Sequence, residues 1–409
     1  MRSTDPRRDL SAPSRRIATL GLLAAGLGWR NAAASEAPAH AAPGPSPPPG
    51  RVLQVGPGRA LATPSQAARV ARDGDTVVVD AGDYRGDAAV WTQAQLTLRS
   101  QGGRARLHAD GAAAQGKALW VMRGGRFDVQ GFDFSGVRVP SRNGAGIRFE
   151  SGDLTVRDCR FIGNEMGLLT ANQADAVLTA QDCEFAHNLR PDGHNHNLYV
   201  GAIAQLTVTG CWLHHATTGH LLKSRAAVNH ILYNRLTDEA GGHASYELEF
   251  PNGGVAVVLG NLIQQSLTTE NAAMLAYGME GYRWARNALL LVNNTLVDDL
   301  PQGGSFLRIA PGAVLVRALN NLLVGGSSTL TAIEGAEISA NRALPRSAFV
   351  DADGFDFRPV PATRWPVAPV AVNLPELLPA GPARQYQHPA GTLARLHGLE
   401  RLGAFDPAP

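Results

Sequence analysis

A short β-type segment recurs along the chain at a nearly constant interval, and this repeat constrains the fold more than any other feature. The segments are "LTVRDCRF", "LTAQDCEF", "LTVTGCWL", "HILYNRL", "VVLGNLI", "LLVNNTL" and "RALNNLL". Their aligned positions are separated by 24, 28, 23, 27, 33 and 27 residues, with a mean of 27, and they are Cys159, Cys183, Cys211, Asn234, Asn261, Asn294 and Asn321.

A repeat of this length without a helical period predicts a solenoid, in which successive coils stack into one core. Leucine-rich repeats have a similar length but would show leucines at two- and three-residue spacing followed by a helix, whereas β-branched alternation and glycine turns recur here. We therefore predict an all-β parallel β-helix. Equivalent residues would lie about 5 Å apart on successive coils, so the cysteines and asparagines form a column. The cysteines are then structural, and a disulfide between neighbouring coils is the less favoured alternative.

The two ends of the chain differ from the repeat. Residues 1 to 34 resemble a twin-arginine export signal, with an ordinary secretory signal as the alternative, because paired arginines precede a short apolar run. Residues 35 to 50 are rich in proline and predict a flexible linker. The β-helix is expected over 51 to 342, opened by a capping helix with Thr63 as N-cap and Pro64 in its first turn. Residues 343 to 409 predict an irregular C-terminal cap.

Composition limits the partners of this chain. Hydrophobic residues make up 44% of the sequence, which supplies a large core and excludes disorder throughout. Removal of residues 1 to 34 takes away six arginines and two aspartates, so the formal net charge changes from +2 to −2. We therefore expect no nucleic-acid partner and no membrane span in the mature chain, which would be a periplasmic or secreted monomer.

The helix followed by "DGDTVVVDAGDY", the asparagine column and the closing "DFRPVPATRWPV" and "RLGAFD" together resemble the right-handed parallel β-helix proteins of the pectate-lyase-like superfamily. The resemblance covers nearly all of the predicted mature chain and implies the fold. It leaves the chemistry open, because lyases, hydrolases, epimerases and adhesins share this scaffold.

Three strand-like segments, "HNLYVG", "GHLLKSR" and "SYELEF", suggest where the chemistry lies. Alternation sends Tyr199, Lys223 and Glu247 outward at spacings of 24 and 24, with Arg225 and Glu249 beside them. A register counted from the cysteine and asparagine column instead aligns Tyr199 with Leu222 and Glu249. Cross-coil ion pairs without a catalytic role are the structural alternative.

Only two of the 37 basic residues are lysines, and an amine at Lys223 can lose a proton where a guanidinium cannot. A β-elimination on a uronate polymer needs a base and a positive charge on the substrate carboxylate. Lys223 would be the base and Arg225 the clamp. The leaving oxygen would be protonated by Tyr199 or by a neighbouring histidine. The candidate histidines for that role are His196 and His220.

The arrangement is similar to that of the alginate lyase and chondroitinase B group of β-helix lyases, which use a lysine, an arginine and a calcium ion. This resemblance implies calcium at Glu247 and Glu249, with an amide contribution from Asn197. In that group the Glu-x-Glu precedes the lysine, whereas here it follows one coil later. The further residues expected to contact substrate are Asn197, His194, His215 and Glu280.

The sequence therefore predicts an exported enzyme acting on an acidic polysaccharide, most directly a lyase. A C5 epimerase would share the proton abstraction, and a glycoside hydrolase would use paired carboxylates such as Glu247 and Glu249. A non-catalytic carbohydrate-binding surface protein is the alternative of a different class, and it predicts that Lys223 can change without loss.

Overall fold

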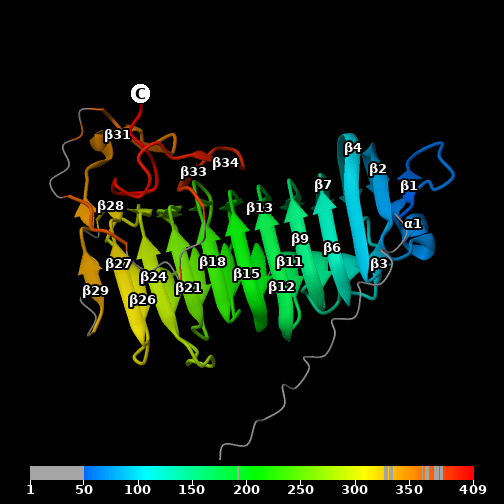
Figure 1. The fold of residues 1–409 in the computed structure, drawn as a ribbon, viewed down its shortest axis with the longest axis horizontal. Coiled ribbons are helices and arrows are strands. Elements are labelled where there is room, and N and C mark those ends of the chain that lie inside the picture. Colours follow the sequence, from blue (N-terminus) through cyan, green and yellow to red (C-terminus); the bar gives the residue numbers. More distant parts are fainter. Residues whose placement is uncertain are drawn as a thin grey trace, which may run out of the picture. The chain divides into compact units, whose positions relative to one another are not determined.

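The computed structural model describes residues 50–190, 193–326, 330, 335–361, 363, 368–372, 377 and 381–409. The predicted export signal and all but the last residue of the predicted linker lie outside these described residues. In the described part, three rows of parallel strands follow one another repeatedly and make a β-helix of about 10 turns (Figure 1). The predicted all-β parallel β-helix is confirmed. No helix in this part of the chain is long and apolar enough to cross a membrane.

The first two rows belong to one 21-stranded sheet, which also contains β1 (Val52–Val55). Each of the long strands β2 (Thr76–Arg85) and β4 (Gln95–His108) runs through both rows. The first row contains β6 (Gly125–Gln130), β9 (Gly152–Arg157), β12 (Gln173–Gln181), β15 (Ile203–Thr209), β18 (Val228–Leu232), β21 (Val255–Leu259), β24 (Ala288–Val292), β27 (Leu315–Leu319) and β29 (Glu337–Ser339). The second row contains β7 (Phe132–Ser135), β10 (Arg160–Ile162), β13 (Glu184–Ala186), β16 (Trp212–His214), β19 (Arg235–Thr237), β22 (Leu262–Gln265), β25 (Thr295–Asp298), β28 (Leu322–Gly325) and β30 (Arg342–Ala343).

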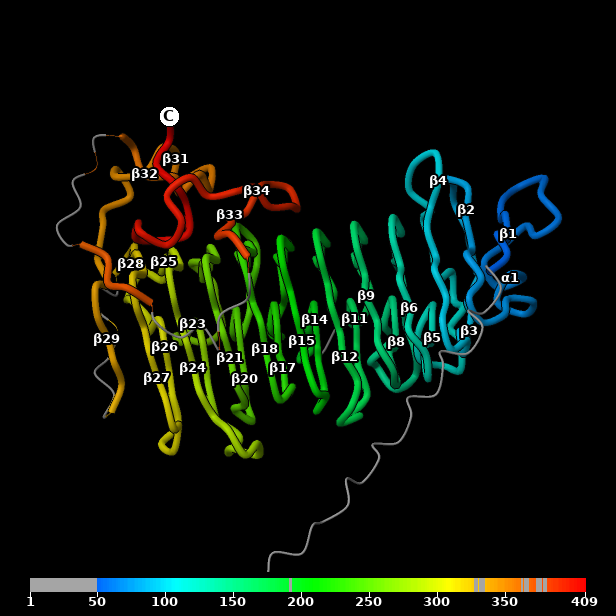
Figure 2. Tube along the Cα trace, viewed as in Figure 1, coloured from blue at the N-terminus to red at the C-terminus, as the bar shows by residue number. Residues whose placement is uncertain are grey.

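The third row is a separate nine-stranded parallel sheet, and its central strands carry the outward residues singled out above. Figure 2 shows how the chain reaches this sheet once in each turn of the β-helix. Its strands are β3 (Ala89–Trp91), β5 (Ala118–Met122), β8 (Ala145–Phe149), β11 (Met166–Thr170), β14 (Leu198–Val200), β17 (Leu222–Ser224), β20 (Leu248–Phe250), β23 (Ala273–Tyr277) and β26 (Ser305–Ile309).

The predicted column of cysteines and asparagines runs along one corner of the β-helix. The side-chain oxygen of Asn261 accepts the backbone N–H of Asn234 at 2.8 Å, and its amide donates to the side-chain oxygen of Asn294 at 3.0 Å. The same bond from a backbone N–H joins Cys211 to Asn234 at 2.9 Å. The three cysteines are buried and free. These contacts satisfy buried corner groups on successive coils and hold the coils in register.

Inside the β-helix, apolar side chains on neighbouring coils stack on one another. The rings of Phe134, Phe161 and Phe185 are nearly parallel, with centroids 5.1 and 4.8 Å apart. The strand pairing places these residues directly above one another. Because each coil repeats the same inward positions, the core continues through the whole stack and the outer faces keep a fixed geometry.

The helix α1 (Pro64–Val70) begins at the predicted proline, and Thr63 makes no side-chain capping hydrogen bond. The sequence did not predict β1, which precedes this helix and pairs with β2. Beyond the last coil are a short 3₁₀ helix (Arg346–Ala348) and two antiparallel pairs, β31 (Phe349–Asp351) with β32 (Asp356–Pro359) and β33 (Arg384–Tyr386) with β34 (Thr392–Ala394). This segment packs back along the second row, where Gly391 N donates to Gly210 O at 2.8 Å.

Candidate active site

The outer face of the nine-stranded sheet carries one continuous row of functional side chains. The strand register aligns Tyr199 with Lys223 and Lys223 with Glu249. The flanking leucines Leu198, Leu222 and Leu248 are fully buried, as the predicted alternation requires. The predicted place of Glu247 in this row is wrong. The connection from Lys223 to its partner is two residues longer than the connection from Tyr199 to Lys223, so Glu249 takes that place.

Lys223 forms ion pairs with two carboxylates. Its Nζ lies 2.8 Å from Glu249 Oε2 and 3.0 Å from Glu280 Oε1, and its side chain is only 13% exposed. The Nε2 atom of His220 lies 2.8 Å from the same oxygen of Glu249. Burial would raise the pKa of Glu249, but the hydrogen bonds from His220 and Lys223 outweigh it and lower that pKa. Glu249 is therefore charged and shared between a lysine and a histidine.

Arg225 connects the row to a loop that follows β23. Its Nε donates to Tyr199 Oη at 3.0 Å, and its Nη1 donates to Asn252 Oδ1 at 2.6 Å. The same guanidinium meets Glu280 at 2.8 and 3.0 Å. Glu280 thus lies on both Arg225 and Lys223, and the hydrogen bond from Arg225 is the largest cause that lowers the pKa of Glu280 to about 2. Its side chain is 43% exposed, so this carboxylate closes the site from the solvent side.

His196 lies against the phenol of Tyr199, with ring centroids 5.3 Å apart. Its Nδ1 accepts the backbone N–H of His220 at 3.0 Å, which leaves the hydrogen on Nε2 in the neutral ring. Burial, together with the positive charges around it, lowers the pKa of His196 well below its usual value. His196 is therefore a neutral hydrogen-bond donor at neutral pH and is not placed to act as a base.

Three adjoining hollows follow the row and share its side chains. One of about 390 Å³ is lined by Arg148, Asn172, His196, Tyr199 and Lys223, and one of about 450 Å³ by His194, His220, Lys223 and Glu270. A third, of about 280 Å³, lies between Tyr199, Arg225, Glu280 and Trp284. Together they form a groove across several coils, and we call it the Lys223 groove.

The sequence analysis missed Arg148, which occupies the same outward row two coils before Tyr199. Burial lowers its pKa, and it forms no ion pair with the residues that the structure describes. The alternation in "AGIRF" could have placed this arginine outward. Asn252 and Trp284 were also missed, because both come from turns. Trp284 Nε1 donates to the backbone oxygen of Arg225 at 3.1 Å and supports that residue.

Three predicted site residues do not lie in the Lys223 groove. Glu247 is fully buried, and both of its carboxylate oxygens lack a hydrogen-bond partner among the described residues. Asn197 is also fully buried and belongs to a second asparagine column, in which its side chain accepts from Asn188 at 2.8 Å and donates to His214 O at 2.7 Å. His215 lies at the end of the second strand row. The three residues lie away from the groove because the turns between strands differ in length, so the mean repeat does not give their positions.

The predicted calcium pair is therefore not formed. Glu249 already accepts from Lys223 and His220, and the side chain of Glu247 is fully buried and lies outside the row that contains Glu249. Calcium prefers several charged or carbonyl oxygens directed at one point, and these two side chains do not supply them.

Comparison with known proteins supports the architecture. No protein-family model and no curated protein sequence matches the chain. The crystal structure of pectate lyase Pel9A is similar over 88% of this chain and 97% of its own, with a TM-score of 0.57 and 15% identity. A second solved structure, Geobacillus virus E2 ORF18, covers 67% of this chain and 53% of its own, with a TM-score of 0.45 and 11% identity.

The fold and the row of side chains on its nine-stranded sheet define a parallel β-helix protein with a charged groove. More narrowly, the chain has a pectate-lyase-like parallel β-helix, as the resemblance in the sequence implied.

Proposed function

We propose that this protein is an exported enzyme, acting in the periplasm or outside the cell, that cleaves an acidic, uronate-containing polysaccharide by β-elimination in the Lys223 groove. One observation carries the proposal. Lys223 and Arg225 together hold a single carboxylate, that of Glu280, at 2.8 to 3.0 Å. A carboxylate on the substrate would meet the same two cations in the same way, because paired or bidentate cationic donors recognise carboxylates strongly.

Binding of the substrate carboxylate would displace Glu280 from the two cations. Glu280 is the more exposed of the two carboxylates on Lys223, at 43% against 5% for Glu249, so it is the one that can leave. Arg148 provides a further cation along the groove for the next acidic sugar. The fold neighbour is described as a pectate lyase, which agrees with an acidic polymer as substrate.

In the reaction, Lys223 would take the proton from the carbon next to the carboxylate, and the electron pair would form the new double bond as the bond to the leaving oxygen breaks. Arg225 would stabilise the negative charge that develops on the carboxylate. Tyr199 would protonate the leaving oxygen. Its own oxygen accepts from Arg225, so its hydrogen is free to donate to another group. Glu249 and His220 would position Lys223, which would act in its neutral form after its resting proton has passed to solvent.

A non-catalytic protein that binds acidic glycans is a second candidate, and the ion pairs of Lys223 favour it. The amine of Lys223 contacts two carboxylates at 2.8 and 3.0 Å, and a lysine engaged in two ion pairs suits binding more than proton abstraction. Both candidates predict recognition of a uronate. They differ in whether the amine of Lys223 is required for a new product.

The test is to incubate the protein with polygalacturonate, alginate and a glycosaminoglycan while following the ultraviolet absorbance of the unsaturated uronide. Wild type, Lys223→Met and Lys117→Met would be compared with added calcium and with a chelator. Lys117 is the matched control, because it is the other lysine and pairs with Glu150 outside the groove. Product from wild type and Lys117→Met, and none from Lys223→Met, would support the lyase.

The remaining outcomes separate the alternatives. Product from Lys223→Met at the wild-type rate would exclude Lys223 as the base. Binding of a uronate without product would support the non-catalytic candidate, while exchange of the C5 proton with solvent deuterium without cleavage would identify an epimerase.

A further inference from the structure

A cluster of three histidines lies outside the Lys223 groove, at the turns that follow β13 and β16. Each of His187, His214 and His215 offers a ring nitrogen within 4.8 Å of the other two. Among the described residues, no other group of three or more histidine, cysteine or carboxylate side chains was found that close together. The ring centroids of His187 and His215 are 4.6 Å apart, and His214 Nδ1 lies 2.6 Å from His215 Nδ1.

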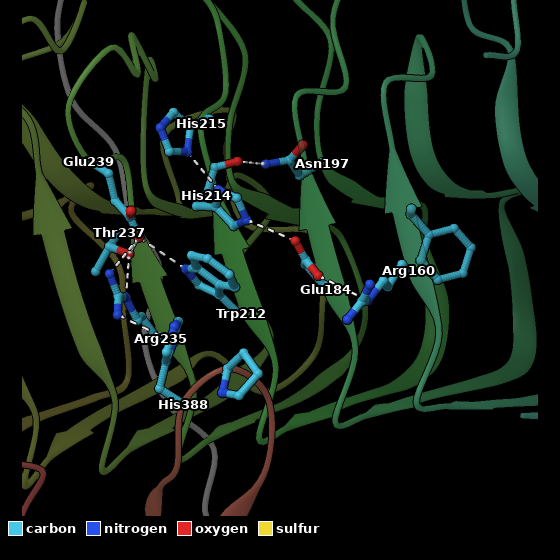
Figure 3. Close-up of polar contacts among 12 residues, drawn as sticks. Arg160, Glu184, Asn197, Trp212, His214, His215, Arg235, Thr237, Glu239 and His388 are labelled. Carbon is cyan, nitrogen blue, oxygen red and sulfur yellow. Dashed lines mark hydrogen bonds and ion pairs between the residues drawn. The ribbon is translucent and has the colours of Figure 1, made fainter. Parts of the chain in front are cut away.

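The outer nitrogens of two of these rings have acceptors as partners. His214 Nε2 lies 3.4 Å from Glu184 Oε1 (Figure 3). His215 Nε2 lies 3.2 Å from the backbone oxygen of Ala240. A carbonyl or carboxylate oxygen only accepts, so each Nε2 carries the hydrogen and each Nδ1 has a free lone pair. The two lone pairs then face each other, an arrangement that a shared cation would stabilise.

The surroundings favour a metal ion over a proton as that cation. Three ring nitrogens lie within 4.8 Å of one another, whereas a single shared proton would join only two of them. Neutral imidazole is the form that binds transition metals. The carboxylate of Glu184 lies behind His214, with Oε1 3.4 Å from the Nε2 of that ring, and its Oε2 lies 3.2 Å from Arg160 Nε. A carboxylate behind a ligating histidine is a common way to fix the ring and its tautomer.

The backbone gives a second, independent observation. His187 and His215 have φ of 53° and 50°, in the left-handed region. The strand register makes them equivalent to Gly136 and Gly163, which have φ of 79° and 70° on the two preceding coils. Glycine adopts this conformation without strain, whereas a side chain raises its cost. Two successive coils thus carry imidazoles at a turn position where earlier coils have glycine, and strain of this kind points to function.

We propose that His187, His214 and His215 bind one divalent transition-metal ion, with zinc as the best fit. Three imidazole nitrogens suit zinc, cobalt, nickel or copper and do not suit calcium. Two nitrogens on a tetrahedral zinc ion lie about 3.4 Å apart, given zinc–nitrogen distances of about 2.0–2.1 Å. Binding would therefore move the two Nδ1 atoms apart by roughly 0.8 Å from their present 2.6 Å. His187 is exposed, so a metal can enter and a solvent ligand can complete the site.

Surrounding side chains hold the cluster in place. Trp212 stacks on His214 with centroids 3.8 Å apart, and Arg160 Nε lies 3.2 Å from Glu184 Oε2 (Figure 3). Glu184 is a positioning residue, because it would contact the metal only through His214. Loss of such a partner commonly weakens metal binding by about 10- to 100-fold.

The experiment uses protein without a histidine tag, treated with a chelator and then dialysed. Zinc would be titrated calorimetrically, and cobalt would report the coordination through its visible absorption. We expect one equivalent of zinc in wild type and loss of stoichiometric binding in His187→Gly and His215→Gly. Glycine is chosen because it fits the left-handed backbone, so these variants should unfold at or above the wild-type temperature without metal. Glu184→Gln should bind about 10- to 100-fold more weakly.

Two controls make the result decisive. His397→Ala changes an exposed histidine far along the chain and should bind zinc as wild type does. His220→Ala removes a histidine of the Lys223 groove and should also keep the zinc. Zinc that is lost in His220→Ala but kept in His187→Gly, or an unchanged cobalt spectrum in His215→Gly, would overturn the proposal. So would the absence of stoichiometric zinc binding in wild type.

Discussion

Replacing Glu280 with glutamine should make the Lys223 groove bind an acidic sugar more tightly. Glu280 forms ion pairs with Lys223 at 3.0 Å and with Arg225 at 2.8 Å, and its side chain is 43% exposed. A partly exposed ion pair contributes about 0.2–1 kcal/mol, so the two pairs contribute roughly 0.4–2 kcal/mol. A substrate carboxylate that takes this position must replace those contacts. At about 1.4 kcal/mol per tenfold change in affinity, Glu280→Gln should bind about 2- to 30-fold tighter.

The assay is calorimetric titration of uronate oligosaccharides at pH 7 and low ionic strength, since salt screens these charges. Glu270→Gln is the matched control, because Glu270 is an exposed acid that lines the same groove and has no ion pair with Lys223 or Arg225. If the two variants gained affinity equally, general repulsion would explain the effect. Weaker binding by Glu280→Gln would refute the reasoning and would identify Glu280 as a direct contact to the sugar.

Two further predictions concern the scaffold. Asn261→Ala removes the side-chain hydrogen bonds that Asn261 makes with Asn234, with Asn294 and with Ile231 O, and it leaves buried groups unpaired. It should therefore lower the free energy of unfolding, measured in a denaturant titration, by about 3–5 kcal/mol. A loss below about 1 kcal/mol would show that the column is not a main stabilising element. Burial raises the pKa of Glu247, so its contribution to stability is present below the unfolded pKa of about 4.3 and is lost as pH rises. Glu247→Gln should therefore match wild type near pH 4 and unfold at a higher temperature near pH 8, and an equal difference at both pH values would contradict a buried neutral carboxyl.

The sequence predicted the fold because a solenoid repeats its corner residues at nearly regular intervals. The column from Cys159 to Asn321 could be aligned by eye, and short-range spacing also placed Tyr199 beside Lys223. The register then failed at the next coil, where a connection longer by two residues put Glu249 in the row and sent Glu247 inside. Mean spacing predicts coils, but each loop length decides which side chain faces outward.

The other errors arose from contacts that no periodic pattern reports. Asn197 entered the second column only nine residues after Asn188, far short of the mean repeat of 27 residues. Glu280 reached Lys223 from a loop 57 residues later in the chain. Its residue type suggested a contact with substrate, whereas its position suggests that it competes with the substrate carboxylate for Lys223 and Arg225. Loop conformation, which depends on tertiary contacts, determined both outcomes.

The Lys223 groove and the histidine cluster arise from the same coils, yet the two proposals assign them ligands of opposite charge. Asn197 fixes the end of β16 through His214 O and immediately precedes β14, which carries Tyr199. The groove presents a lysine and arginines and would recognise anions, while the cluster presents imidazoles and would recognise a metal cation. Neither set of side chains supplies a ligand to the other. A chelator should therefore empty the histidine cluster without removing any contact in the groove, and activity that survives chelation would place calcium and zinc outside the elimination step.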